Sequence, residues 1–317
     1  MQRLITKMFS IIPKLFKKLE FRFSGNIIGI FLMLNMVLAG LIMTGLVKLI
    51  VQDIDFRVLV FGRFFFSLPI LYFFGWFLRG NQILKVQAKL VLSGRIFIGI
   101  IGMCLWFSAI QLADFGQVTA ITQSSAVFVA LFAPIFLNEK VGMWRWTAIF
   151  LGLFGIILIT NPFDDNFSTG IYYALGVAIS SSMLAILLRK LGKSDEPITV
   201  AIWHNTIGAI IFSLFLIVNF PDDLILNFNL LFLLAVIGIA GSALQICFTY
   251  AFKYGEAVVL TPIRYLAIPG AVVVGFIFWN EIPSKVVTLG MIITIFSCVI
   301  IAWREFINNN KLKLAEK

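Results

Sequence analysis

The sequence predicts an all-α membrane protein with ten transmembrane helices in two inverted five-helix repeats. Composition is the first reason: 61% of the 317 residues are hydrophobic and only 13% are charged, whereas a soluble domain carries about 25% charged residues. An internal repeat is the second. Segments 109–139 and 251–281 align without a gap at an offset of 142 residues, and both close on the pattern Phe-x-Asn-Glu. Repeats of this kind within an apolar chain are typical of transporters.

Ten segments are long and apolar enough to cross a bilayer, for which a helix needs about 20 residues. The predicted spans are 27–50, 56–78, 91–112, 115–137, 143–161, 170–188, 197–218, 229–252, 257–279 and 286–303. The connections between them are short and leave no room for a soluble domain. We expect residues 1–26 to form a basic amphipathic segment on the cytoplasmic membrane surface, or a partly ordered tail. Residues 304–317 are expected to form a second cytoplasmic tail.

The lysines and arginines predict the orientation of the spans. With the N-terminus inside, inner segments hold 20 of the 25 basic residues. The outer connections hold three, Lys48, Arg57 and Lys285, and two more, Arg63 and Arg264, lie within spans. Both termini are therefore expected in the cytoplasm, with the protein in the inner (cytoplasmic) membrane.

Each half of the chain has five spans, and five is an odd number. The second repeat, 170–303, therefore enters the membrane in the opposite sense to the first, 27–161. Such inverted repeats let two exchanged conformations open one central site to either face of the membrane.

Several motifs can be compared with a known family. In the first half they are Phe61-Gly62-Arg63-Phe64, Leu112-Ala113-Asp114 and Leu137-Asn138-Glu139; in the second, Thr261-Pro262-Ile263-Arg264-Tyr265-Leu266 and Trp279-Asn280-Glu281. Together they resemble the drug/metabolite transporter superfamily, specifically its EamA-domain proteins. The second set is similar to a subgroup that includes S-adenosylmethionine and riboflavin uptake carriers. The resemblance covers about residues 27–303 and implies secondary transport of a small metabolite, without identifying which one.

Two departures from the family pattern bear on this resemblance. The family usually has glycine before the closing glutamate of the fourth and ninth helices, whereas this chain has Asn138 and Asn280. Asparagine is the next-best residue for a left-handed helix end, so we expect the helix ends to be kept. Thr44 stands where relatives of the subgroup often carry an acidic residue, which weakens any proton-coupling role implied by the resemblance.

Arg264, about a third of the way into the ninth span, is the expected main substrate anchor. A charged residue at such a depth is costly to insert and marks a functional site by default. Its guanidinium offers a planar fork to a carboxylate or phosphate; alternatively, it extends to the membrane surface. Tyr265 adds an aromatic ring and a hydroxyl, and Gln123 lies one position from the repeat counterpart of Arg264.

Arg63 and His204 occupy matching positions of the second and seventh spans at an offset of 141. We predict that Arg63, His204 and Lys48 bind the substrate together with Arg264, Tyr265 and Gln123, and that Lys48 lies close to Arg63. His204, the only histidine in the chain, is either a titrating group or a hydrogen-bonded packing residue. The predicted substrate is thus a small anionic or zwitterionic metabolite, such as an amino-acid derivative or a nucleoside-like cofactor.

Four carboxylates lie at predicted helix ends: Asp114, Glu139, Glu256 and Glu281. Asp114 and Glu256 open helices, where the helix dipole favours a negative charge. Glu139 and Glu281 close helices and need another partner. Lys140, Arg145 and Lys285 are the candidates, and we interpret these glutamates as mainly architectural.

A flippase, an enzyme and a channel are the alternatives to a metabolite carrier. A lipid-linked sugar flippase of the same superfamily is the nearest alternative. A membrane-embedded enzyme is less favoured, because the sequence offers neither a nucleophile–base set nor a cluster of metal ligands. A channel would need a filter loop or a ring of charges, and the sequence shows neither. We therefore expect no enzyme activity, cofactor, metal or nucleic-acid partner; the lipid bilayer and a small molecule are the expected partners, and the oligomeric state stays open.

Overall fold

The computed structural model describes residues 25–137, 143–160, 168–191, 194–218, 221, 227–254, 260 and 263–315. Within these ranges every regular element is helical. The elements are α3 (Gly25–Ile50), α4 (Phe56–Phe65), α5 (Leu68–Arg79), η1 (Gly80–Gln82), α6 (Lys89–Leu112), α7 (Phe115–Gln123), α8 (Ser125–Leu137), α9 (Met143–Thr160), α10 (Gly170–Leu191), α11 (Pro197–Val218), α12 (Phe228–Tyr254), α14 (Ala267–Trp279) and α15 (Lys285–Ala315).

Length and hydropathy identify this chain as a multi-pass membrane protein. Seven helical segments in the described ranges are long and apolar enough to cross a bilayer. Three shorter apolar helices accompany them: Trp146–Thr160, Ala267–Trp279 and Lys285–Ile300. Large apolar side chains such as Phe31, Phe97 and Ile292 are exposed on the surface of the bundle, as expected where lipid replaces water. The predicted count of ten crossings remains a prediction.

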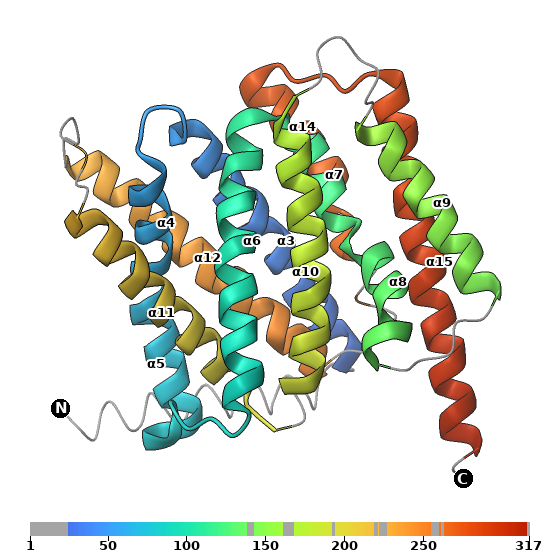
Figure 1. The fold of residues 1–317 in the computed structure, drawn as a ribbon, viewed down its shortest axis with the longest axis horizontal. Coiled ribbons are helices and arrows are strands. Elements are labelled where there is room, and N and C mark those ends of the chain that lie inside the picture. Colours follow the sequence, from blue (N-terminus) through green and yellow to red (C-terminus); the bar gives the residue numbers. More distant parts are fainter. Residues whose placement is uncertain are drawn as a thin grey trace.

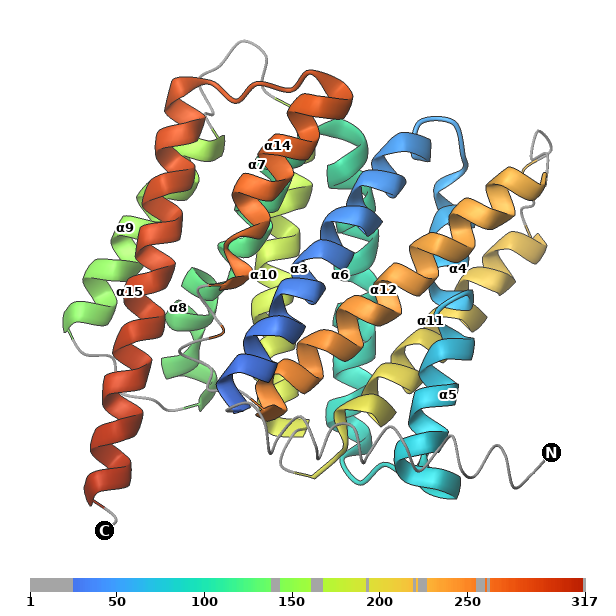
Figure 2. The same ribbon diagram turned by 180° about the vertical axis from the view of Figure 1, so that it is seen from behind.

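The two halves of the chain are packed into one another. Helix α3 packs against α12, α6 against α10, and α9 against α15, so each of these pairs joins the first half to the second. Figures 1 and 2 show the α9–α15 pair at one side of the bundle, away from α4, α5 and α11. Small residues allow close helix contact: a Cβ added at Gly290 would lie 2.8 Å from the carbonyl oxygen of Gly155.

Three of the predicted spans are interrupted. The second breaks at Phe66 and Ser67, between α4 and α5, and the ninth at Tyr265 and Leu266, just before α14. A proline follows each of these breaks, at position 69 or 269. Proline has no N–H to donate to the carbonyl four residues earlier, which removes a helical hydrogen bond at each break.

The fourth span breaks at Ser124, between α7 and α8. No proline lies here; instead, the Ser124 hydroxyl donates to the carbonyl of Ile121 at 2.5 Å. Ser124 and Leu266 are separated by the repeat offset of 142 residues, so the fourth and ninth spans are interrupted at matching positions.

The bundle has two opposite ends, which we name by a carboxylate that lies at each. At the Glu281 end, α3, α6 and α14 terminate and α4 and α7 begin (upper end in Figure 1). At the Asp195 end, α6 and α11 begin and α5 terminates.

Candidate functional site

Arg264 lies beside the matched helix breaks, together with Gln123. The Nη2 of Arg264 donates to Gln123 Oε1 at 3.4 Å. Its Cζ lies 5.2 Å from the centroid of the Phe248 ring on α12. The Nε of Arg264 is buried and has no hydrogen-bond partner among the described residues. The guanidinium is therefore held by one long hydrogen bond and one ring contact, and it keeps donor capacity for an incoming acceptor.

Tyr265 follows Arg264 in the chain but lies in another environment. Its side chain is buried, with 4% exposed, in an apolar cluster with Val127 of α8, Ala148 of α9 and Cys298 of α15. The structure thus places Tyr265 in the packing between these helices.

Arg63 is the centre of a second polar group. Its Nη1 donates to Asn205 Oδ1 at 2.7 Å and to Ser67 Oγ at 3.2 Å. The Ser67 hydroxyl in turn contacts the carbonyl of Gly238 on α12 at 2.9 Å. Arg63 and Asn205 are 142 residues apart, so two repeat counterparts touch each other. Sequence reasoning had paired Arg63 with His204; the exact repeat offset was the signal that could have identified Asn205.

His204 and Arg95 lie next to this group. His204 packs its ring edge-on against Phe64, with centroids 5.3 Å apart, and its Nδ1 has no partner in the described part of the chain. A Cβ added at Gly99 of α6 would lie 2.7 Å from His204 Cε1 and 3.4 Å from Arg95 Nη1. The two side chains therefore flank one glycine.

Arg95 corrects the sequence analysis. It was counted with the basic residues of an inner connection, but it lies inside α6 and is only 7% exposed. Its Nε and Nη1 are buried and make no hydrogen bond to any residue that the structure describes. Arg95 is the seventh residue of α6 and also lies inside the predicted span 91–112, so its nearness to the start of that span led the charge pattern to place it at the inner surface.

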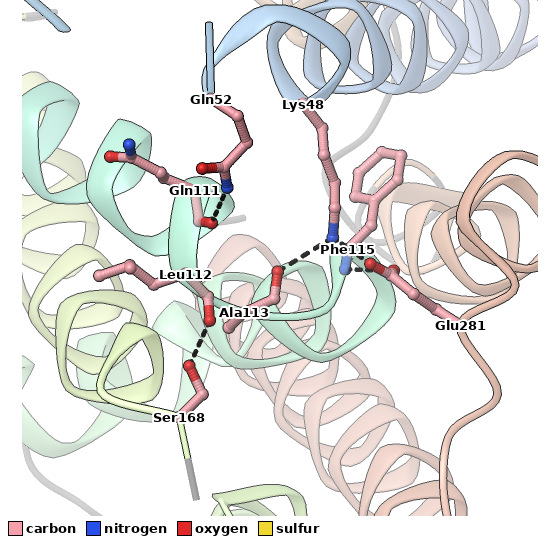
Figure 3. Close-up of polar contacts among 8 residues, drawn as sticks. All are labelled: Lys48, Gln52, Gln111, Leu112, Ala113, Phe115, Ser168 and Glu281. Carbon is pink, nitrogen blue, oxygen red and sulfur yellow. Dashed lines mark hydrogen bonds and ion pairs between the residues drawn. The ribbon is translucent and has the colours of Figure 1, made fainter. Parts of the chain in front are cut away.

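Lys48 lies at the Glu281 end of the bundle (Figure 3). From the sequence, Lys48 is expected near Arg63, and Lys285 is among the candidate partners of Glu281. The Nζ of Lys48 pairs with Glu281 Oε1 and donates to the carbonyl of Ala113 at 3.0 Å. The same ammonium lies 5.5 Å from the centroid of the Trp279 ring. Glu281 Oε2 accepts a hydrogen bond from the backbone N–H of Phe115 at 2.8 Å. The partner of Glu281 is thus Lys48, and the expectation of Lys285 was wrong.

Other side chains hold the same turn between α6 and α7. Gln52 Nε2 donates to the carbonyl of Gln111 at 2.7 Å, and the Ser168 hydroxyl donates to the carbonyl of Leu112. Figure 3 shows these side chains converging on the turn from separate elements. The last carbonyls of α6, which have no partner inside their own helix, are satisfied in this way.

A cavity of about 790 Å³ lies at the Asp195 end, between α5, α11 and α12. Its polar lining residues include Arg79, Gln82, Glu196, Gln245 and Thr249. Gln245 Oε1 accepts a hydrogen bond from Asn205 Nδ2 at 3.4 Å, and Asn205 in turn accepts from Arg63. The cavity wall is therefore connected to the buried Arg63 group by two hydrogen bonds.

Asp195 joins the two halves at this end of the bundle. Its carboxylate accepts hydrogen bonds from Gln87 N at 2.7 Å, Ala88 N at 3.0 Å and Ser194 Oγ at 2.8 Å. Burial alone would raise the pKa of this carboxyl group, but the hydrogen bonds and the nearby charge of Arg79 hold the pKa below its usual value.

Some of the residues named from the sequence cannot be placed. Glu139, Glu256 and Pro262 lie outside the described residues, as do the side chains of Lys140 and Arg145. Asn280 has φ 59° and ψ 27°, so the left-handed helix end expected at this asparagine is confirmed.

One family model matches both halves of the chain. Residues 27–161 and 168–303 each match the EamA-like transporter family. An S-adenosylmethionine uptake transporter of Rickettsia bellii is 27% identical over 252 residues, covering 79% of this chain and 84% of that protein. A riboflavin transporter of Vibrio cholerae is 26% identical over 213 residues, covering 67% and 70%. A solved crystal structure with 15% identity superposes with a TM-score of 0.61 over 87% of this chain and 96% of the other, a likeness of fold alone.

Proposed function

The chain belongs to the EamA-like transporter family, and on this premise we propose that it is a carrier for a small anionic or zwitterionic metabolite, working by alternating access. In this proposal ten helices cross the cytoplasmic membrane as two inverted halves, 27–161 and 170–303. The Glu281 end faces outward. The Asp195 end and the tails 1–26 and 304–317 face the cytoplasm.

The pair of matched helix breaks is the observation that carries this proposal. Carriers with inverted repeats bind their substrates where helices at corresponding positions of the two halves are interrupted. Here the breaks at Ser124 and Leu266 are related by the repeat offset. Gln123 lies directly before the first break, and Arg264 lies two residues before Leu266. The hydrogen bond between these two side chains joins the halves at the place where a substrate would bind.

The two ends of the bundle support an arrangement that is closed outside and open inside. At the Glu281 end, Lys48 and Glu281 join the halves, and their side chains are only 11% and 14% exposed. At the Asp195 end, the 790 Å³ cavity lies between α5, α11 and α12 and reaches the buried Arg63 group through Gln245 and Asn205; Gln123 and Arg264 are not among its lining residues.

The buried arginines support an anionic group on the substrate. Arg63 and Arg95 are 5% and 7% exposed, and Arg264 is partly buried. None of the three forms a salt bridge with a carboxylate in the described ranges. Unpaired buried charge is costly, and a substrate carboxylate or phosphate would reduce that cost. Uptake of S-adenosylmethionine or riboflavin, for which relatives are named, makes cofactor-like metabolites the first compounds to test.

The test is initial uptake into proteoliposomes that contain the purified protein. Labelled compounds should include a carboxylate metabolite, a zwitterionic amino-acid derivative, a neutral flavin and a hydrophobic cation, with protein-free vesicles as the control. We expect uptake of an anionic or zwitterionic compound. Preferred uptake of the hydrophobic cation, or chemical conversion of a compound without its transport, would contradict the proposal.

A further inference from the structure

Two helices at the Glu281 end begin with the same residue in the same backbone conformation. Asp55 is the N-cap of α4, with φ −51° and ψ 129°, and Asp114 is the N-cap of α7, with φ −64° and ψ 140°. An aspartate in this position normally accepts a hydrogen bond from an N–H in the first turn of its helix. Asp55 does so: its Oδ1 accepts from Arg57 N at 2.7 Å.

Asp114 makes no such bond, although its backbone is ready for one. The first intrahelical hydrogen bond of α7, from Val118 N to the carbonyl of Asp114, is formed at 2.9 Å. The side chain of Asp114 nevertheless caps no N–H of its helix and is exposed. Part of the difference lies in the sequence: the side chain of Arg57 also pairs with Asp55, at 2.9 and 2.8 Å, whereas glycine stands two residues after Asp114.

The carboxylate of Glu281 supplies a second reason. Glu281 comes from the other half of the chain and accepts a hydrogen bond from Phe115 N, the first N–H of α7. Lys48 pairs with Glu281, whereas Asp114 forms no salt bridge to a described residue. A second carboxylate folded onto the same helix start would meet the charge of the first, and like charges at close range repel. The two carboxylates also line the same 290 Å³ pocket.

We propose that Glu281 and Asp114 exchange places as the cap of α7 when the Glu281 end opens. In the closed arrangement Glu281 caps α7 across the two halves, and Lys48 holds it there by binding both Glu281 and the carbonyl of Ala113. On opening, Glu281 leaves with α14, and the Asp114 carboxylate turns onto the first-turn N–H groups, as Asp55 does on α4. Glu281 binds the first N–H of α7, whereas an N-cap aspartate binds the second or third. The positive end of α7 therefore keeps a carboxylate in both arrangements, which lowers the cost of releasing the closure.

Two glycines, one in α7 and one in α14, lie where these helices and the Glu281 side chain come into close contact. A Cβ added at Gly275 would lie 2.8 Å from Glu281 Oε2. A Cβ added at Gly116, in the first turn of α7, would lie 2.8 Å from Val272 Cγ2. The absence of a side chain at Gly116 therefore lets α7 approach α14 closely, and its absence at Gly275 leaves room for the carboxylate of Glu281.

The experiment measures opening through the reactivity of a single cysteine. Val287 is buried, with 6% exposed, and lines the 290 Å³ pocket, so Val287→Cys reports on its opening. Cys104, Cys247 and Cys298 are replaced, and the labelling rate is measured in vesicles with a membrane-impermeant maleimide added on the Glu281 side. We expect Glu281→Ala to raise this rate by at least fivefold and Asp114→Ala to lower it by at least threefold.

Matched variants separate capping from other effects. Serine is a good N-cap, so Asp114→Ser should label within twofold of the parent protein. The double variant Asp114→Ala/Glu281→Ala should label more slowly than Glu281→Ala alone. Asp55→Ala removes a cap at the same end without touching the contact between halves, and it should leave the rate unchanged.

The inference rests on the proposed alternating access, but the two can fail separately. If Asp114→Ala labels as fast as the parent or faster, cap exchange is wrong, whatever the uptake assay shows. If the labelling rates follow the expected order but no compound is taken up, the exchange stands and the proposed carrier function is the part in error.

Discussion

Two carboxylates each cap a helix that belongs to the other half of the chain. They differ in whether the capped helix has an acceptor of its own that could take over if the carboxylate moved away. Asp195 precedes α11 and caps the start of α6; Glu281 follows α14 and caps the start of α7. The N-cap residue of α6 is Ala88, which has no side-chain acceptor, and that of α7 is Asp114, which has one. If Asp195 moved away, the N–H groups of Gln87 and Ala88 would lose their acceptor.

This difference indicates that the Asp195 contact between the halves is permanent and that the Glu281 contact can be released. Asp195 accepts from three neutral donors, and neither backbone N–H at the start of α6 has a local substitute. A hydrogen bond to a charged group contributes about 1.5–3 kcal/mol, and Asp195 accepts two from the backbone of the other half, so the Asp195 end resists separation there. At the Glu281 end, Asp114 offers the substitute. The comparison therefore predicts that the halves turn about the Asp195 contact and part at the Glu281 contact.

The largest effect is expected between the two ends, at Arg264. Replacing Arg264 with Leu removes the charged donors next to Gln123, and a hydrogen bond to a charged group contributes about 1.5–3 kcal/mol. Initial uptake, normalised to protein in the membrane, should fall by about 10- to 100-fold while folding is kept. Arg264→Lys keeps the charge but loses the planar fork, and it should restore transport only in part.

An arginine that merely extends to the membrane surface would give another pattern. Lysine would then replace it almost silently, and Leu would change insertion only slightly. Full uptake by Arg264→Leu would remove Arg264 from the site, and the group that binds the substrate would then lie elsewhere between the two ends.

The next effect concerns stability and compares the two caps directly. Asp195→Ala should lower the free energy of unfolding by about 1–3 kcal/mol, because two backbone N–H groups lose their acceptor together. Lys48→Met/Glu281→Ala should lower it by less, since Asp114 can cap α7 and no unpaired lysine remains. Thermal unfolding of both variants in the same detergent measures the difference. A larger loss of unfolding free energy in the Glu281 variant would mean that the Glu281 contact is the permanent one and the Asp195 contact the one that is released.

The pH dependence of stability sharpens the same comparison. The pKa of Asp195 is held below its usual value by hydrogen bonds in the folded protein. The stabilisation is therefore present above the unfolded pKa of about 3.9 and is lost as the pH falls through the lower folded pKa. The melting temperature should drop on acidification below about pH 4, and the drop should be smaller in Asp195→Asn. An equal drop in both proteins would show that other carboxyl groups cause it.

The sequence predicted the helices well because bilayer thickness and hydropathy decide them locally. The span predicted at 197–218 coincides with α11, and the one at 170–188 ends three residues before α10 does. The interruption at Ser124 was not predicted. It depends on a serine hydroxyl replacing a backbone donor, and serine occurs in many uninterrupted membrane helices.

The site was predictable only where the repeat supplied long-range information. The offset brought Gln123 and Arg264 under consideration together, and the structure places them in contact. Lys48 and Glu281 are 233 residues apart, and the repeat does not align them with each other. Their pairing follows from the packing of α3 against the α6–α7 turn, so sequence neighbours such as Lys285 seemed the better partners. Arg95 was missed because charge near a helix end gives no measure of burial.

The smallest expected effect is at Gly275, where a single methyl group tests the Glu281 contact. In Gly275→Ala the added Cβ would lie 2.8 Å from Glu281 Oε2, and the carboxylate, at the end of a flexible side chain, would have to shift. Alanine is favoured over glycine inside a helix by about 1 kcal/mol, so α14 itself should be no less stable. We therefore expect labelling of Val287→Cys to rise by about twofold, less than in Glu281→Ala, with an unchanged melting temperature. Adding Gly275→Ala to Glu281→Ala should have no further effect on labelling, because the group that the methyl displaces is gone. A further rise in that double variant would mean that the methyl group acts on the packing of α14 rather than on the cap of α7.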